Sequence, residues 1–518
     1  MGHSAIPPRK IVIVGGGTAG WMSASLILKA WANKGTDLTL IESEDIGTIG
    51  VGEGSTPSLR DFFRQLEIPE SEWMPECNAT YKCGIGFPNW STNNGFESYF
   101  HPFFSKQDLT TGNAFMQNAC IRRRGGDAPA HPDNFWVSTQ LAAHKKSPIP
   151  QEALPFESDY GYHFDSGLLG QFLKRRALKL GMSHITGTVK EVTQNDNGDI
   201  ESLITQSNDE IQADFFIDCT GFSAYLIEKV LKVPFNSYKD SLLNDRAVAI
   251  ASTLDNSQPI PSHTASEALS CGWAWKIPLA NRYGNGYVYS SNYLSEEEAE
   301  AELRAHIGPS CNNMKARHLK LRVGRREKHW CNNVLAVGLS QGFIEPLEAT
   351  ALMLIQYTID RFIHYFEKGS EKGQSIDEQR TTYNNKVNAN FEGIKDYILA
   401  HYHLNTRYDS EYWQANRDNP LLSTRLKTIL KAWDDGLDFE AALTQFKGEL
   451  SYMRPSWYCL LAGMGRFPEE LSTVNDPLKV ASATKALRHC QELTDNYHDH
   501  RDNLMNTYAD KWPDTEQA

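Results

Sequence analysis

The sequence has no apolar run long enough to cross a bilayer, and its first residues lack the apolar core of a secretory signal. Its nine cysteines are scattered without C-x-x-C pairs, so neither a zinc site nor a disulfide framework is predicted. Basic clustering is scarce: the only run of three arginines covers residues 122–124, and the formal net charge is -13. These absences argue against a membrane protein, a metal site and a nucleic-acid partner, and they favour a cytoplasmic protein.

The chain is long for a single core, because 518 residues normally form two or three domains or one large domain with insertions. No internal repeat or low-complexity tract divides it. Aromatic residues make up 11% of the sequence, which is typical of a pocket for a flat ligand as well as of a large core. Composition alone therefore predicts a large globular protein and leaves its function open.

A glycine-rich turn near the N-terminus lies between an expected strand at residues 10–14 (KIVIV) and an expected helix at 21–32. A second expected strand at 38–41 ends beside Glu42. This β-α-β context is what the G-x-G-x-x-G fingerprint requires, because its glycines allow a tight turn, the approach of a pyrophosphate and close helix packing. The alternative is a glycine-rich turn without a ligand. The expected contacts of a dinucleotide are Gly15, Gly16, Gly17, Thr18, Ala19, Gly20 and Glu42, with Glu42 on a ribose.

Two later segments favour FAD over NAD. Residues 214–221 (DFFIDCTG) and 335–340 (LAVGLS) resemble strand ends that lie near the adenine and near the ribityl chain and ring in FAD-binding proteins. Only one G-x-G-x-x-G fingerprint exists, so the electrons are expected to come from another protein. Further expected FAD contacts are Val189, Gly338, Leu339 and Leu352.

The rest of the chain divides into an irregular stretch, a mixed stretch and a helical stretch. Residues 56–155 are rich in Gly, Pro, Asn and aromatics and are predicted to be an insertion of loops and short elements. The region beyond about residue 370 is dominated by helical patterns. Between them we expect a helix at 163–180, strands at 185–192, 200–205 and 334–337, a hairpin turn at 283–286 (YGNG), and an amphipathic helix ending at Gly369.

Several ordered motifs resemble the flavin-dependent halogenases related to tryptophan halogenase. They extend from the nucleotide fingerprint to beyond residue 355, and a weaker match at 456–463 (SWYCLLAG) continues the series. The motifs are GVGEGSTP at 50–57, YK at 81–82 followed by GIGFPNW at 84–90, FHPF at 100–103, YHFD at 162–165, GWAWKIP at 272–278 and GFIEPLEAT at 342–350.

The resemblance implies an α/β fold: an FAD-binding, Rossmann-like core of the flavoprotein monooxygenase type with mixed sheets, plus a mainly helical C-terminal region. Residues 1–355 are expected to form the FAD-binding domain, with the insertion around 56–155 carrying the lysine and substrate segments. Residues 356–518 are expected to complete the substrate pocket.

The resemblance also implies a two-component reaction. FADH2 from a separate flavin reductase would react with O2 and with chloride or bromide to give hypohalous acid. Lys82 would meet this oxidant, either as a hydrogen-bonding ammonium or as a haloamine, and the sequence leaves that choice open. Glu348 would orient the oxidant or accept the ring proton, with Glu345 as its rival. Backbone N–H groups of Thr350 and Ala351, at the start of a helix, would hold the halide.

The substrate side is implied by aromatic residues. Trp273 and Trp275 would separate the organic substrate from the flavin, and His101 and Phe103 would stack on the substrate. Two positions depart from the family. The halide loop is Glu-Ala-Thr-Ala at 348–351, where Glu-Ser-Thr-Gly is usual, which suggests a different halide preference. Residues 433–456 lack the Tyr-Tyr pair and following Glu that grip free tryptophan, so an indole-like substrate without a zwitterion is expected.

Three other functions stay open at this point. An FAD-dependent aromatic hydroxylase would use the same nucleotide site, but it would let the substrate reach the flavin. A non-catalytic flavin-binding protein would need only the nucleotide site. A flavin-linked reductase of isoprenoid double bonds would share the N-terminal fold without a need for Lys82. No nucleic acid, membrane or metal is expected, and a homodimer is possible.

Overall fold

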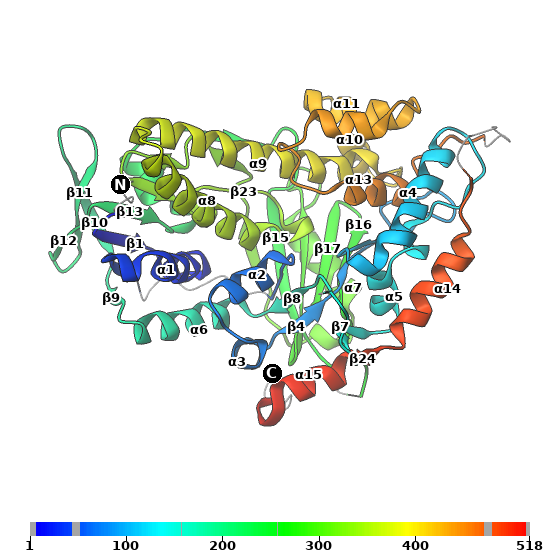
Figure 1. The fold of residues 1–518 in the computed structure, drawn as a ribbon, viewed down its shortest axis with the longest axis horizontal. Coiled ribbons are helices and arrows are strands. Elements are labelled where there is room, and N and C mark those ends of the chain that lie inside the picture. The colour runs from blue at the N-terminus through cyan, green and yellow to red at the C-terminus, as the bar shows by residue number, and fades with distance from the viewer. Residues whose placement is uncertain (1–6, 44–51, 157, 256, 471–478, 514–518) are drawn as a thin grey trace.

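The computed structural model describes residues 7–43, 52–156, 158–255, 257–470 and 479–513 (Figure 1). Its N-terminal part is a six-stranded sheet with the strand order β21-β22-β13-β1-β2-β9. All neighbours pair in parallel except β21 and β22. The strands are β1 (Lys10–Val14), β2 (Asp37–Glu42), β9 (Ser183–Thr186), β13 (Phe215–Asp218), β21 (Trp330–Cys331) and β22 (Val334–Ala336).

Helices cover this sheet because its central strands are apolar on both faces. Four of the five residues of β1 are buried, as a parallel strand between helical layers requires. Helix α1 (Thr18–Trp31) follows β1 directly and packs against α6 (Ser166–Lys179) and α8 (Ala351–Glu371). The predicted β-α-β unit is confirmed, with helix α1 starting at Thr18 rather than at Trp21.

A second, seven-stranded sheet builds the other half of the molecule, in the order β19-β15-β18-β17-β16-β5-β6. It is antiparallel except where β5 meets β16. Strands β5 and β6 come from the insertion at 56–155, so this segment contributes to the sheet as well as to loops. The strands are β5 (Gly84–Pro88), β6 (Ser98–Pro102), β15 (Arg246–Thr253), β16 (Thr264–Leu269), β17 (Gly272–Pro278), β18 (Arg282–Tyr289) and β19 (Arg317–Lys320).

A three-stranded sheet, β3-β8-β4, lies at the junction of the two halves. It consists of β3 (Glu53–Gly54), β8 (Gly161–Phe164) and β4 (Thr80–Lys82). The insertion also contains α4 (Leu109–Arg123), α5 (Val137–Ala143) and β7 (Lys146–Pro150). Because β3 belongs to the glycine-rich motif at 50–57, the motif lies two strands from Lys82. Its first two residues lie outside the described residues.

The C-terminal region is mainly helical, as expected. Helix α8 runs without a break across residue 355. Helices α9, α10 and α11 lie along the upper side of the molecule in Figure 1, α14 runs down one edge toward β24, which pairs with β7, and α15 follows along the lower side. These elements are α9 (Ile376–Leu404), α10 (Glu411–Arg417), α11 (Thr424–Asp434), α12 (Phe439–Gln445), α13 (Arg454–Gly463), α14 (Ala483–Thr494), β24 (Tyr497–Asp499) and α15 (His500–Tyr508).

Three expected boundaries were wrong for local reasons. The helix expected from residue 163 begins at Ser166, because Asp165 caps it by accepting hydrogen bonds from two backbone N–H groups. The strand expected at 185–192 divides at Gly187 into β9 and β10 (Val189–Gln194), which belong to different sheets. Helix α8 continues past Gly369 to Glu371.

The hairpin turn expected at 283–286 is also wrong. These residues lie inside β18, and the turn falls at residues 280–281, where the Leu279 N–H donates to the Arg282 carbonyl at 2.9 Å. Gly286 faces the Trp275 indole on the neighbouring strand, and a Cβ there would lie 2.0 Å from Trp275 Cζ2. The glycine therefore makes room for an indole rather than for a turn.

Among the described residues, none of the helices is both long and apolar enough to span a bilayer.

The Gly286→Ala substitution is expected to lower the free energy of unfolding by about 2 kcal/mol or more, because the methyl group overlaps the Trp275 ring. Urea unfolding followed by fluorescence measures the change. Gly187→Ala is the matched control, since the nearest atom to its new Cβ is Ile41 Cδ1 at 4.0 Å. Equal stability of the two variants would contradict this account of Gly286.

Candidate active site

The glycine-rich turn forms an open cradle at the start of α1. A Cβ at Gly15 would lie 2.2 Å from the Cys219 carbonyl oxygen, and one at Gly20 would lie 1.9 Å from the Gly15 carbonyl oxygen. Gly17, the N-cap of α1, has no atom within 4 Å of its would-be Cβ and has no side-chain cap. Free N–H groups at a helix start with space in front of them suit a pyrophosphate.

Glu42 lies at the end of β2 above this turn. Its Oε2 would be 1.4 Å from a Cβ on Gly16, so that glycine is needed for the close approach. Glu42 Oε1 accepts hydrogen bonds from Lys174 Nζ at 2.5 Å and His184 Nε2 at 2.8 Å. Lys174 and His184 fix the carboxylate at the strand end, which is where a ribose-binding acid lies in this fold.

Some of the other expected cofactor residues lie close to the same helix. Gly338 has a φ of 70°, and a Cβ on it would lie 2.7 Å from Ala19 Cβ, so the end of β22 touches the start of α1. The Thr18 hydroxyl donates to the Ser166 carbonyl at 3.2 Å. Leu352 is buried in α8, and Leu339 and Val189 are half-buried. The cradle, strand ends and open helix start fit an FAD, although the individual contacts remain predictions.

Lys82 is fully buried at the end of β4. Its side chain has 0% exposure, and within the described residues no group accepts a hydrogen bond from its Nζ. Nζ lies 5.6 Å from the centre of the Phe103 ring, and a Cβ on Gly54 would lie 3.1 Å from Nζ. Burial lowers the pKa of Lys82 to about 7, and the negative charge of Glu348 opposes part of that shift.

A neutral histidine lies beside this amine. The Thr80 hydroxyl donates to the Pro278 carbonyl at 2.6 Å, so it accepts from His163 Nδ1 at 3.1 Å, and His163 Nε2 accepts from the Thr264 hydroxyl at 2.9 Å. Burial lowers the pKa of His163 well below its usual value, and Lys82 adds to the effect. The tautomer is thus fixed, and no second positive charge faces Lys82 from this ring.

Glu348 is a buried carboxylate between two histidines. His101 Nδ1 lies 3.2 Å from Oε2 and His401 Nε2 lies 3.1 Å from Oε1. Burial by itself would raise the pKa of Glu348, but the two histidines outweigh burial and lower the pKa to about 2. The carboxylate is therefore ionised throughout the neutral range, and it acts on Lys82 through space rather than through an ion pair.

Glu345, the rival acid, faces a different environment. It accepts a hydrogen bond from Asn244 Nδ2 at 2.9 Å and another from the Tyr402 hydroxyl. Burial raises the pKa of Glu345 to about 7, while Tyr402, Asn244 and Trp273 oppose the shift. Two acids separated by only two residues therefore differ: the pKa of Glu345 is raised and that of Glu348 is lowered.

The expected halide residues occupy the start of α8. The Thr350 carbonyl accepts from the Leu354 N–H at 2.9 Å, so Thr350 is the N-cap and Ala351 begins the helix. Ala349, before them, adopts a left-handed φ of 55°. The N–H groups of both residues therefore lie at the positive end of a 21-residue helix dipole.

Trp273 and Trp275 lie side by side on β17 as predicted, with ring centres 6.1 Å apart, and both are buried. His101 is buried, and its Nδ1 is engaged by Glu348, a contact that the motif did not predict. The half-buried Phe103 packs its ring on Gly161, the strand partner of Lys82. The substrate contacts assigned to these four residues stay predictions.

Three residues of this site were missed. His401 reaches Glu348 from α9, and its Nδ1 contacts the Tyr397 carbonyl one turn earlier at 2.9 Å. Tyr452 stacks on Tyr397 with ring centres 3.7 Å apart, near His101. Their only signal was an aromatic-rich C-terminal sequence, which is equally typical of a core.

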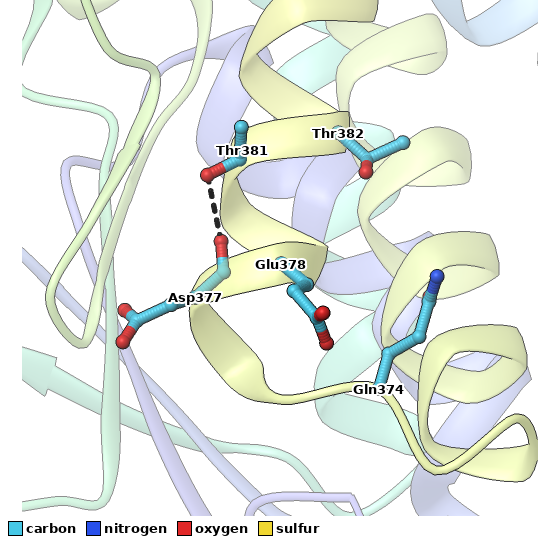
Figure 2. Close-up of a pocket in the computed structure, with 5 residues that line it drawn as sticks. All are labelled: Gln374, Asp377, Glu378, Thr381 and Thr382. Atoms are coloured by element: carbon cyan, nitrogen blue, oxygen red, sulfur yellow. Dashed lines mark hydrogen bonds between the residues drawn. The ribbon is translucent and has the colours of Figure 1, made fainter.

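A surface hollow of about 430 Å³ lies at the start of α9, at the opposite end of that helix from His401 (Figure 2). It is lined by Gln374, Asp377, Glu378, Thr381 and Thr382, and Thr381 donates its hydroxyl to the Asp377 carbonyl at 2.8 Å. That bond belongs to the first turn of the helix. The hollow contains none of the predicted site residues.

Lys82→Met is expected to raise the free energy of unfolding at pH 6 by an amount on the order of a few kcal/mol. At that pH the folded wild type holds a buried charge that the unfolded chain leaves in water. The gain should shrink as pH rises from about 7 toward 10.5. In this range the amine is neutral in the folded protein and charged in the unfolded chain, and the free energy needed to remove its proton on folding falls as pH rises. Urea unfolding at pH 6 and pH 9 measures it. Lys276→Met, at an exposed lysine, is the control, and a gain independent of pH would contradict the assignment.

The chain resembles one family of known proteins in both sequence and structure. The family model described as tryptophan halogenase matches residues 10–479. The 7-chloro-L-tryptophan 6-halogenase KtzR of a Kutzneria species is 37% identical over 481 residues, covering 88% of this chain and 90% of the relative. The tryptophan 6-halogenase SttH of Streptomyces toxytricini is 34% identical over 505 residues, covering 93% and 94%.

Solved structures agree with the sequence comparison. The crystal structure of SttH superposes with a TM-score of 0.83 at 33% identity, covering 96% of this chain and 100% of that one. BrvH, a flavin-dependent halogenase from a Brevundimonas species, superposes with a TM-score of 0.82 at 29% identity, covering 96% and 99%. The chain therefore belongs to the tryptophan halogenase family of flavin-dependent halogenases.

Proposed function

We propose that the protein is a two-component halogenase that transfers chlorine or bromine to an electron-rich, indole-like aromatic at Lys82. Bound as FADH2, the flavin supplies the reaction of O2 with halide that gives hypohalous acid, and a separate flavin reductase supplies the FADH2. The observation that carries the proposal is the buried Lys82 amine without a hydrogen-bond partner among the described residues, near an ionised buried carboxylate.

Lys82 is suited to receive a small polar oxidant. A buried amine whose donors are unused gains a hydrogen bond when hypohalous acid arrives, which favours binding. With a pKa of about 7, both the ammonium and the amine exist near neutral pH. The ammonium can polarise the oxidant, and the amine can accept its halogen, so either route is chemically open.

Glu348 is proposed to act after the carbon–halogen bond forms. The halogenated ring cation is a strong acid, so even a weakly basic carboxylate can accept its proton. Because His101 and His401 hold Glu348 ionised, the acceptor is ready without a prior proton loss. Its negative charge also raises the pKa of Lys82 against the effect of burial, which couples the two groups.

The halide is proposed to bind at the backbone N–H groups of Thr350 and Ala351. The positive end of α8 attracts an anion without offering it a strong acid. Ala349 and Ala351 stand where the family usually has a serine and a glycine, so the serine hydroxyl is missing but the backbone donors remain. A halide preference different from that of proteins with Glu-Ser-Thr-Gly is therefore proposed.

An indole-like substrate without a free amino-acid group fits this chain better than free tryptophan. The relatives named above are tryptophan halogenases, but residues 433–456 lack the Tyr-Tyr pair and Glu that hold the zwitterion. Instead, α12 lies in that stretch. Arg123 holds the end of the preceding helix, α11, by donating to the Ala432 and Trp433 carbonyls at 2.9 Å and 3.2 Å.

A mass-spectrometric screen tests the function. Purified protein, a flavin reductase, FAD, NADH and either chloride or bromide are incubated with indole and with L-tryptophan. The wild type is expected to halogenate indole in preference to tryptophan, and Lys82→Met is expected to lose at least about 100-fold in product while still consuming reduced flavin. Lys276→Met is the control. Hydroxylated product without any halogenated product would instead indicate an aromatic hydroxylase.

The two acids give a separate prediction. Glu348→Gln should lower the halogenation rate about 10- to 100-fold, because a neutral amide cannot accept the ring proton. Glu345→Gln should change it by less than about threefold, since the Glu345 carboxyl is already close to half protonated at neutral pH and an amide resembles that form. Initial rates at saturating indole measure both variants. The reverse order of effects would transfer the role to Glu345.

A further inference from the structure

The strand that carries Lys82 is an edge strand. In the sheet β3-β8-β4, β8 is the one strand among the described residues that pairs with β4, with Tyr81 opposite Tyr162 and Lys82 opposite Gly161. An edge strand has backbone groups on its outer side that need partners when they are buried. Because Lys82 Nζ has no hydrogen bond of its own among the described residues, the position of the amine depends on how this short strand is held.

The C-terminal helix α15 holds the outer edge of β4. The Tyr81 N–H donates to His500 Nε2 at 3.1 Å, and the Tyr508 hydroxyl donates to the Ala79 carbonyl at 2.7 Å. Residues 500 and 508 are the first and last residues of α15, so the helix spans the strand edge. Figure 1 shows α15 beneath β4 and β8, and 419 positions in the sequence separate Tyr81 from His500.

Geometry fixes the proton on His500. Nδ1 lies 3.0 Å from the Ile260 carbonyl oxygen, which can only accept, so Nδ1 carries the proton and Nε2 presents its lone pair to Tyr81. The ring is 1% exposed, and burial lowers the pKa of His500 to about 4, with Arg501 and His263 adding to the effect. The acceptor is therefore present throughout the neutral range.

The hydrogen bond from His500 Nδ1 to the Ile260 carbonyl connects β4 to a second part of the lysine site. Two residues later in that segment, the Ser262 carbonyl accepts the Cys83 N–H at 2.7 Å, and Thr264 then donates to His163. His500 thus joins the strand on one side of Lys82 to the segment at 260–264 on the other. The charged or titratable groups that face Lys82 are Glu348, His163 and His263.

We propose that His500 is a positioning residue for Lys82, holding the Tyr81 N–H and thereby the strand that presents the buried amine to the oxidant. The role rests on the proposed function of Lys82. It requires no contact between His500 and the substrate or the flavin. His500 acts through the backbone, which is why no motif around Lys82 reports it.

His500→Phe in the full-length holoenzyme tests the proposal, because it keeps a ring and removes both hydrogen bonds. Halogenated indole formed per FADH2 consumed is expected to fall about tenfold, with the missing halogen recovered as free hypohalous acid by a diffusible β-diketone trap. The midpoint of the pH dependence of halogenation, expected near pH 7 in the wild type, should move upward because water beside a displaced amine relieves its desolvation.

Tyr508→Phe is the matched control. It removes the other bond between α15 and the β4 edge but leaves the bond between Tyr81 and His500, so its midpoint and yield should stay within about twofold of the wild type. A loss of folded protein alone would lower the rate equally at every pH without moving the midpoint. An identical midpoint and yield in the His500→Phe and Tyr508→Phe enzymes overturns the proposal.

A second pair of variants covers the case in which His500→Phe does not fold. The amide of His500→Gln can accept from Tyr81 while donating to Ile260, whereas His500→Asn is one methylene too short to reach both. Gln should restore the yield to within about threefold of the wild type and Asn should not. Equal yields from these two variants contradict the role of His500. A wild type that never halogenates contradicts the proposed function instead.

Discussion

The side chain of Lys82 is buried without a hydrogen-bond partner among the described residues, and much of the surrounding structure serves to keep it so. A buried ammonium is costly, and the cost appears as a pKa of about 7. A direct ion pair with a carboxylate would remove that cost and would also occupy the amine. The chain instead places Glu348 near enough to act through space while two histidines bind its oxygen atoms.

The neighbouring groups have complementary charges as a result. His101 and His401 hold Glu348 ionised, and His163 stays neutral because burial lowers its pKa well below the usual value and the charge of Lys82 adds to the effect. Glu345, only three residues from Glu348, has its pKa raised because burial dominates there. Two carboxyl groups of one short loop therefore differ in protonation through their surroundings rather than through their sequence.

The layout of the sheets separates the two ends of the site. The nucleotide cradle belongs to the parallel sheet, whereas Lys82 and the paired tryptophans belong to the small and seven-stranded sheets. Trp275 is accommodated because Gly286 faces it, so the indole pair depends on a glycine on the next strand. In the proposed function, this indole pair would hold an aromatic substrate away from the flavin, and a small inorganic oxidant would have to move past it to reach Lys82.

Local sequence was sufficient to predict the fold where all the residues that form a unit lie in one continuous segment. Residues 10–42 specify a β-α-β unit because the apolar strand, the glycine turn and the helix lie in sequence, and the structure confirms it. Tertiary context overrode local signals elsewhere. The YGNG segment has the composition of a turn, but Gly286 is required beside an indole, and the YHFD segment ends a strand because Asp165 caps the helix after it.

The sequence by itself determined the β-α-β unit with its glycine-rich turn and the paired tryptophans on one strand face, and it singled out Lys82 and Glu348 as candidates for halogen transfer. Only the tertiary structure decided that Lys82 is desolvated, that His101 and His401 bind Glu348, and that His500 contacts the lysine strand. The reason is physical: burial and through-space charge depend on residues separated by hundreds of positions, such as Tyr81 and His500, and no local pattern records such contacts.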